Sequence, residues 1–356
     1  MKWRFALACA PLLIGCARSV EPVLSCEPQG NARPICGFQN PEDLVLLPGG
    51  NAILVSEFGA IGGELPGALS RLDIASGART VLFRGGDAGD AQPTWGDPRC
   101  PGPPSAAFSP HGIDLVRRND GGISLLAVNH GAREAIEYFE VLRGGEALAW
   151  RGCVAGPSGS WWNDVVGTPD GGFYVSQMLP RRKSVLQYFE FFRAAALHRA
   201  SGHVVRWTPD EGFEQVPGTA VVFANGIALS RDGTRLYVNS SLGDGLRRIS
   251  LESGEVEAKA DLPGLDNLAW GTDGRLYAAS LIASMLEVQA CNALESGACP
   301  AAFEIVAVDP DTMATEVVYH GQGAPMGAGT VGLRVGNELF IGSFAGDRVL
   351  RVALGQ

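Results

Sequence analysis

The chain has 356 residues, of which 46% are hydrophobic, 48 are Gly and 22 are Pro, without low-complexity runs. This composition excludes a disordered chain and indicates a folded protein rich in turns. The net charge of −10 at pH 7 argues against a nucleic-acid-binding role, which requires a basic surface.

The N-terminus reads as an export signal. Basic Lys2 and Arg4 precede an apolar run that ends in LIGC at Cys16, which predicts a signal peptide over residues 1–15. The ending is similar to the bacterial lipobox, which would make Cys16 the lipidated first residue; cleavage near Ala17 or a retained anchor is the alternative. A lipid at Cys16 would tether the protein to a membrane, with residues 16–35 as a linker. We therefore expect an exported bacterial lipoprotein that faces the periplasm or the cell exterior.

Six cysteines follow Cys16, at positions 26, 36, 100, 153, 291 and 299. An even number in an exported chain predicts disulfides. The pair Cys291 and Cys299 is the best local candidate, and Cys26 with Cys36 is the next. The remaining connectivity stays open at the sequence level.

One spacing recurs along the chain. In NDVVGTPDGG, Asn163 lies seven residues before Asp170 of an Asp-Gly turn, and apolar or β-branched residues flank the turn. Each copy predicts a strand, a tight turn and a second strand. The other copies begin at Glu42, Asn225, Asp266 and Thr330 with the same offset, and at His111 with an offset of nine.

Second hairpins of a different composition lie between these copies, at 69–83, 135–150, 203–216, 246–260 and 303–319. Two hairpins make a four-stranded antiparallel sheet, which is one propeller blade. Six copies predict an all-β fold, a six-bladed β-propeller over residues 36–356 without a second domain. We expect the strand at 348–354 to close the ring by completing a blade begun near the N-terminus.

The repeated polar residues are expected to converge. The innermost strand of each blade follows the central axis, so residues at its start emerge at one mouth of the ring. Asn and Asp before strands also form Asx-turns, which is their commonest local use. Asx-turns alone do not readily explain why polar residues recur at the same offset in successive blades. The converging set is Glu42, His111, Asn163, Asn225, Asp266 and Thr330.

Oxygen donors dominate this set, with two carboxylates (Glu42 and Asp266) and three amides (Asn163, Asn225 and Asn267). Calcium takes six to eight oxygens in irregular geometry, whereas zinc prefers Cys and His and magnesium demands a tight octahedron. The set therefore predicts a calcium site. The neighbouring carboxylates point the opposite way along their strands and could hold a second, deeper ion. They are Asp43 and Asp164.

The chain also resembles the paraoxonases, which are calcium-dependent arylesterases and lactonases with a six-bladed propeller. The resemblance covers residues 36–354 and rests on NPEDLVLLPGG, SPHGI, LAVNHGAREAIEYFEV, NDVVG, FANGIALSRDG and LDNLAWG, in this order. The SMP-30/gluconolactonase-like and strictosidine-synthase-like propellers are more distant relatives.

The resemblance implies two calcium ions and assigns their ligands. It matches His111 and His130 to a histidine dyad and Phe223 to a pocket wall. The end of the chain, RVALGQ, lacks the cysteine that would bridge to Cys36 in the animal proteins. The implied ligands are Glu42, Asn163, Asn225, Asp266 and Asn267 for a catalytic calcium, and Asp43, Asp164 and the carbonyl of Ile113 for a structural calcium.

The stretch LPRRKSVLQYFEFFRAAALH, residues 179–198, breaks the strand pattern and predicts a helical insertion over about 179–200. The resemblance implies that this helix covers the active-site mouth and contacts lipid. A helix that only packs on the propeller is the alternative.

The predicted function is a calcium-dependent hydrolase of lactones and aryl esters. Calcium would polarise the carbonyl, and water would attack with help from His111, which His130 would orient. A gluconolactonase-like sugar-lactone hydrolase and a non-catalytic calcium-stabilised binding propeller are the alternatives. The expected partners are a small lactone or ester and a membrane, through the lipid anchor and the 179–198 helix.

Overall fold

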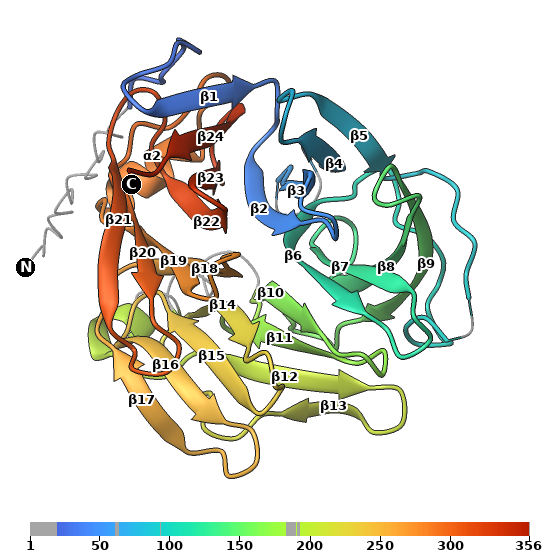
Figure 1. The fold of residues 1–356 in the computed structure, drawn as a ribbon. Helices are drawn as coiled ribbons and strands as arrows, with labels where there is room; N and C mark the ends of the chain where they lie inside the picture. The colour runs from blue at the N-terminus through green and yellow to red at the C-terminus, as the bar shows by residue number, and fades with distance from the viewer. Residues whose placement is uncertain (1–19, 61–63, 93, 183–189, 191–192, 356) are drawn as a thin grey trace, which may run out of the picture.

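The computed structural model describes residues 20–60, 64–92, 94–182, 190 and 193–355. Twenty-four strands form six four-stranded antiparallel sheets around a central axis (Figure 1). The predicted six-bladed β-propeller is confirmed. The predicted signal peptide and Cys16 lie outside the described residues.

The six inner hairpins follow the repeated spacing in the sequence. Their turns need residues that tolerate positive φ, as at Gly171 (92°) and Gly233 (71°), where a Cβ would be strained. The hairpins are β2 (Pro41–Leu46) with β3 (Ala52–Glu57), β6 (Pro110–Arg117) with β7 (Ile123–Asn129), β10 (Trp162–Gly167) with β11 (Phe173–Gln177), β14 (Ala224–Leu229) with β15 (Arg235–Ser240), β18 (Leu265–Trp270) with β19 (Leu276–Leu281), and β22 (Gly329–Val335) with β23 (Glu338–Ser343).

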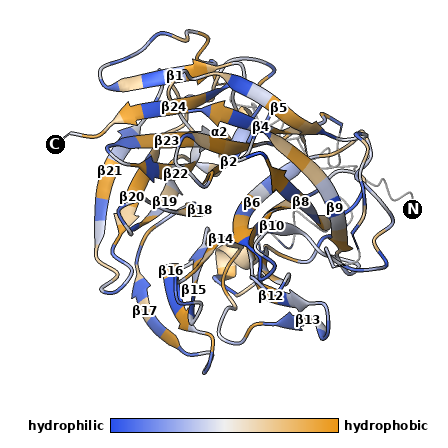
Figure 2. Ribbon diagram, turned by 45° about the vertical axis from the view of Figure 1, so that its right-hand side comes forward, coloured by the Kyte–Doolittle hydropathy of each residue, from blue (hydrophilic) through white to orange (hydrophobic). Residues whose placement is uncertain are grey.

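Five outer hairpins complete blades one to five. Their last strands face solvent on one side, and hydrophilic and hydrophobic residues alternate along β17 (Figure 2). The hairpins are β4 (Ala68–Asp73) with β5 (Arg79–Arg84), β8 (Ala135–Leu142) with β9 (Ala147–Ala155), β12 (His203–Thr208) with β13 (Gly212–Gln215), β16 (Gly245–Ser250) with β17 (Val256–Ala260), and β20 (Phe303–Val308) with β21 (Thr315–Gly321).

The sixth blade closes the ring as expected. Three of its strands come from the C-terminus, namely β22, β23 and β24 (Arg348–Ala353), and the N-terminal β1 (Ala32–Cys36) adds the outermost strand beside β24 (Figure 1). The strand near the C-terminus therefore completes a blade that also contains a strand from near the N-terminus.

The segment before β1 is also more than a linker. Val23 pairs with Ala298, and the fully buried Arg348 donates to the carbonyl of Val23 at 2.9 Å and to that of Ser25. The first described residues of the chain are thus held by the fifth and sixth blades.

The hydrophobic core lies between neighbouring blades. Between the second and third blades, Leu126 and Tyr138 of the second pack with Phe173 of the third, and the ring of Tyr138 lies 6.5 Å from that of Phe173. Such contacts repeat around the ring and fix the blades relative to one another.

Three disulfides connect the six described cysteines: Cys26–Cys36, Cys100–Cys153 and Cys291–Cys299. The two local predictions are confirmed, and Cys36 pairs near the N-terminus, not with the end of the chain. The third pair joins a loop before β6 to β9 and had no local sequence signal.

Two insertions carry helical residues. In the connection between β11 and β12, residues 190 and 193–197 are helical, within the range of the predicted insertion; the part at 183–189 and 191–192 lies outside the described residues. A second insertion, α2 (Met285–Cys291), follows β19, was not predicted, and starts with a capping box at Ser284. Among the described residues, no helix combines the length and apolar character that crossing a bilayer requires.

Candidate functional site

The inner strands of all six blades begin around one axis (Figure 1). Each predicted polar residue is the second residue of its inner strand, and the pairing with the next strand is interrupted by a β-bulge at this point. A bulge turns its residues away from the regular alternation of the strand. The repeated spacing therefore marks six bulged positions, occupied by Glu42, His111, Asn163, Asn225, Asp266 and Thr330.

Glu42 contacts residues from several other blades. Its Oε1 accepts the amide of Asn267 at 2.7 Å and lies 3.4 Å from Nε2 of His111. Its backbone carbonyl accepts the hydroxyl of Thr330 at 2.7 Å. Residues up to 288 positions apart are thus brought together, and Glu42 is only 1% exposed.

A second layer is formed by Asp43 and Asp164. Oδ2 of Asp43 accepts the N–H of Ile113 from the next blade, and Oδ2 of Asp164 accepts the N–H of Ile227 in the same way, each at 2.7 Å. The two aspartates therefore join the first blade to the second and the third to the fourth. Ile113, whose carbonyl the resemblance assigns to a structural ion, lies in this layer.

Glycine makes this close approach possible. A Cβ at Gly112 would lie 2.6 Å from the carbonyl oxygen of Asn163 and 2.7 Å from Oδ1 of Asp164. A Cβ at Gly226 would lie 2.5 Å from the carbonyl oxygen of Asp266. The HGI and NGI sequences at these positions are therefore required by backbone packing at the axis.

Four carboxylates are buried at this axis, and within the described ranges none of them forms an ion pair with Arg or Lys. Burial, followed by the charge of Glu42, raises the pKa of Asp266 to about 7. Burial and a neighbouring carboxylate also raise the pKa values of Asp43 and Asp164 well above the usual range. Concentrated negative charge without a counter-charge is costly in a protein interior, so the site favours a cation.

Unpaired oxygens show where a cation fits. Buried oxygens that accept no hydrogen bond include Oε2 of Glu42 and Oδ1 of Asn163, Asn225 and Asn267. No three His, Cys, Asp or Glu side chains in the described part of the chain are close enough to hold a metal ion by themselves. The amides would therefore complete the shell, and an all-oxygen set of this kind suits calcium.

A histidine pair borders the carboxylates. Nδ1 of His111 lies 3.0 Å from Nε2 of His130, and the ring of Phe58 stacks on His111 at 4.8 Å. Burial lowers the pKa of His111, but the charges of Glu42, Asp266 and Asp43 outweigh this and raise it overall. His130 is 1% exposed and its Nδ1 lies 3.1 Å from Oε2 of Glu134.

Phe223, the predicted pocket-wall residue, lies directly before β14 and is half-buried. Its φ of 59° is rare for a bulky residue. Such strain often accompanies a functional position.

Phe58 and Met178 lie beside the site but were not predicted from the sequence, and they occupy equivalent positions in their blades. Phe58 and Met178 directly follow the second strand of their blade, as His130 does. Sδ of Met178 is 3.7 Å from the amide nitrogen of Asn163, so this position also faces the site. A comparison of the residues that follow the second strand of each blade could have found Phe58 and Met178. No such repeated position marks Glu134.

Known proteins share this architecture. The family model for the SMP-30/Gluconolactonase/LRE-like region matches residues 67–287. A gluconolactonase from Xanthomonas campestris superposes with a TM-score of 0.54 at 14% identity, covering 95% of this chain and 96% of that chain. A calcium-binding protein, regucalcin, from Agrobacterium tumefaciens gives 0.51 at 13% identity, with 90% and 92% covered.

A luciferin-regenerating enzyme also gives a TM-score of 0.51, at 10% identity, with 89% and 92% covered. At these identities the solved structures support the fold alone. No curated protein sequence matches the chain.

Proposed function

Because the chain belongs to the SMP-30/gluconolactonase/LRE-like family, we propose that it is a calcium-dependent hydrolase that opens lactones and cleaves aryl esters. The observation that carries the proposal is the set of four unpaired buried oxygens beside a histidine pair. A lactone hydrolase needs a positive charge at the carbonyl oxygen and a base for water, and these two features supply the places for both.

The proposed calcium ligands are Glu42, Asn163, Asn225, Asp266 and Asn267. When bound there, calcium would supply the charge that polarises a carbonyl and stabilises the oxyanion that forms. Asp43, Asp164 and the Ile113 carbonyl are proposed to hold a second ion that ties the blades together. The inter-blade hydrogen bonds of Asp43 and Asp164 support a structural role for this layer.

His111 is the proposed general base. Its Nε2 faces the carboxylate of Glu42, whereas its Nδ1 is occupied by His130. A proton taken from water at Nε2 would therefore arrive beside a carboxylate, which stabilises the resulting positive charge. Phe58 covers one face of the imidazole and limits its access to bulk water.

Apolar side chains favour hydrophobic substrates over sugar lactones. Phe58 stacks on His111, Met178 contacts Asn163, and Phe223 lies two residues before Asn225. A polar sugar lactone would find few hydrogen-bond partners among these groups. We propose aliphatic lactones and aryl esters, in agreement with the paraoxonase resemblance, over gluconolactone.

The test is hydrolysis of an aliphatic lactone, gluconolactone and phenyl acetate by the protein from residue 17 onward. Activity should disappear on chelation and return with calcium. Replacing Asp266 by Asn or Asn225 by Ala should abolish turnover, whereas Asn31→Ala, which removes an outer-edge amide bonded to Ala353, should not. Full activity of either site variant would contradict the proposal. Calcium-dependent stability without hydrolysis would favour a binding propeller.

We also propose that the protein is exported and anchored through lipidated Cys16. Three disulfides support export, because such bonds persist in oxidising compartments. Incorporation of a labelled fatty acid into the full-length chain, and its loss in Cys16→Ser, would test the anchor. Equal labelling of both proteins would contradict it.

A further inference from the structure

We propose that Glu134 is a positioning residue that holds the ring proton of His130 on Nδ1, and thereby leaves Nε2 of His130 as the acceptor for the ring of His111. The catalytic consequence rests on the hydrolase function proposed above. The tautomers themselves follow from hydrogen bonding and can be tested without turnover.

Glu134 is held in place from several sides. Its side chain is 8% exposed, and its Oε1 accepts the backbone N–H of Trp162 at 2.7 Å. Its Oε2 faces Nδ1 of His130 at 3.1 Å and accepts Nη1 of Arg181 at 3.1 Å. The permanently charged guanidinium of Arg181 thus forms an ion pair with a carboxylate that is largely buried.

The turn that carries His130 and Glu134 is fixed by its own contacts. Oδ1 of Asn129 accepts the N–H groups of Gly131 and Ser109 at 2.9 and 3.1 Å. At Gly131 a Cβ would lie 1.5 Å from the carbonyl oxygen of Ala107, so only glycine fits there. The distance between Glu134 and His130 is therefore set by the backbone.

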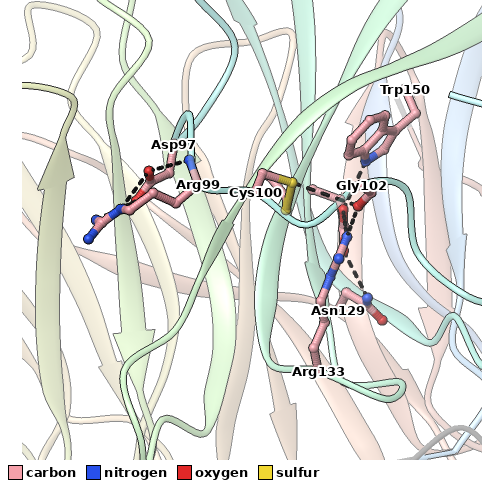
Figure 3. The surroundings of a disulfide bond; sticks show 9 residues. Asp97, Arg99, Cys100, Gly102, Asn129, Arg133 and Trp150 are labelled. Carbon is pink, nitrogen blue, oxygen red and sulfur yellow. Dashed lines mark hydrogen bonds and ion pairs between the residues drawn. A yellow bond between two sulfur atoms is a disulfide. The ribbon is translucent and has the colours of Figure 1, made fainter. Parts of the chain in front are cut away.

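Arg133 also holds this turn in place through hydrogen bonds. It donates to the fully buried Glu137 at 2.8 Å and to the carbonyl of Gly102, also at 2.8 Å. Figure 3 shows Arg133, Trp150 and Asn129 converging beside the disulfide of Cys100. Glu137 accepts hydrogen bonds from all three of these side chains, and the turn is tied to a covalently closed loop.

The tautomers follow in order from Glu134. An ionised carboxylate can only accept, so Nδ1 of His130 must carry the proton. Nε2 of neutral His130 then has a lone pair and must accept, so the proton between the rings belongs to Nδ1 of His111. This hydrogen bond orients the imidazole of His111 so that its Nε2 faces Glu42 and the candidate calcium ligands.

Replacing Glu134 by Gln would disturb this order. The amide has one acceptor and one donor end, whereas three donors (Trp162, His130 and Arg181) now point at the carboxylate. Both carboxylate oxygens lie 3.1 Å from Nδ1 of His130, so the NH₂ group of a glutamine would face this nitrogen from one of the two positions and weaken its preference for carrying the proton. The hydrogen bond between the two rings would then lose its fixed direction, and the imidazole of His111 would be held less firmly.

The direct test is the ¹⁵N chemical shifts of the ring nitrogens in protein labelled at its five histidines. In the wild type, His130 should carry its proton on Nδ1; its signals are assigned by their loss in His130→Gln. Glu134→Gln should remove or reverse this signature. The matched control is Glu140→Gln, which breaks the Glu140–Arg151 ion pair on the neighbouring β8. A proton on Nε2 of His130 in the wild type would overturn the proposal.

Kinetics give the second readout. We expect kcat of Glu134→Gln to fall about 100-fold or more while KM changes little, since removal of an orienting carboxylate in a triad costs on the order of 10⁴. Glu134→Asp should recover at least part of the loss. Wild-type kcat in a folded Glu134→Gln variant would overturn the proposal. A wild type without lactone or ester turnover would refute the proposed function, and the ring-nitrogen shifts would still decide the tautomers.

Discussion

The amide of Asn267 donates to the carboxylate of Glu42 at 2.7 Å and so joins the fifth blade to the first across 225 residues of sequence. The same amide leaves its own oxygen unpaired in a buried position. One side chain therefore orients a neighbouring ligand with its nitrogen and offers a ligand with its oxygen.

Replacing Asn267 by Leu should weaken calcium binding at least tenfold, because it removes one oxygen and releases Glu42. The measurement is the calcium concentration that gives half of the maximal rise in melting temperature. Asn31→Ala serves as a control on the outer edge of the ring. An unchanged calcium dependence would show that Asn267 is not a ligand.

The metal-free protein should lose stability as the pH rises from about 4 to about 7. In this window Asp266, with a pKa near 7, keeps its proton in the folded state, whereas the unfolded chain has already released it. The folded state binds more protons, so the free energy of unfolding falls, by on the order of 4 kcal/mol for a shift of this size. Asp43 and Asp164 act in the same direction.

This dependence is measured by denaturant unfolding after chelation, at constant ionic strength. Saturating calcium should flatten it, because a bound cation favours the ionised carboxylates at every pH. Stability that rises with pH in the chelated protein would contradict the assignment of the raised pKa values.

Gly112→Ala should destabilise the protein by roughly 2–4 kcal/mol, since the new methyl group would overlap backbone atoms of the neighbouring strand. Gly122→Ala is the matched control at the other end of the same hairpin, where the nearest atom is the exposed side chain of Asp120 at 3.1 Å. Equal unfolding midpoints for the two variants would refute the close-packing argument.

The Cys100–Cys153 disulfide should contribute more to stability than Cys291–Cys299. The two bonds close loops of 53 and 8 residues, for which chain entropy predicts about 4 and about 2.5 kcal/mol. Paired Cys→Ser variants compared by denaturant unfolding would check this order. A larger loss from the short loop would mean that local packing decides the outcome.

Much of the ring could be predicted from the sequence because each inner hairpin repeats one spacing. Glu42 and Asp266 were recognised by this offset, and the structure places both at bulged second positions of their strands. Glu134 could not be predicted in this way. It lies in a turn whose course depends on Asn129, Gly131 and Arg133, and this turn does not follow the repeated spacing of the inner hairpins.

The closing blade was expected from the strand at 348–354, but its partner β1 was not identified, since the two strands come from opposite ends of the chain and carry no mutual spacing. The pairing of Cys100 with Cys153 depends on a long loop in the same way. Local periodicity reveals contacts within a hairpin, whereas these contacts depend on the complete ring.

The hydrogen bond from Thr330 to the carbonyl of Glu42 spans 288 residues, from near the start of the chain to near its end. The ribosome synthesises Glu42 early, whereas its partner Thr330 is made only after most of the chain. The early blades can pair their strands while the chain is still growing, but the site at the axis cannot be completed until the sixth blade arrives. A chain interrupted before Thr330 would therefore leave several assembled blades and an unfinished site, so that premature termination would produce folded sheets without function.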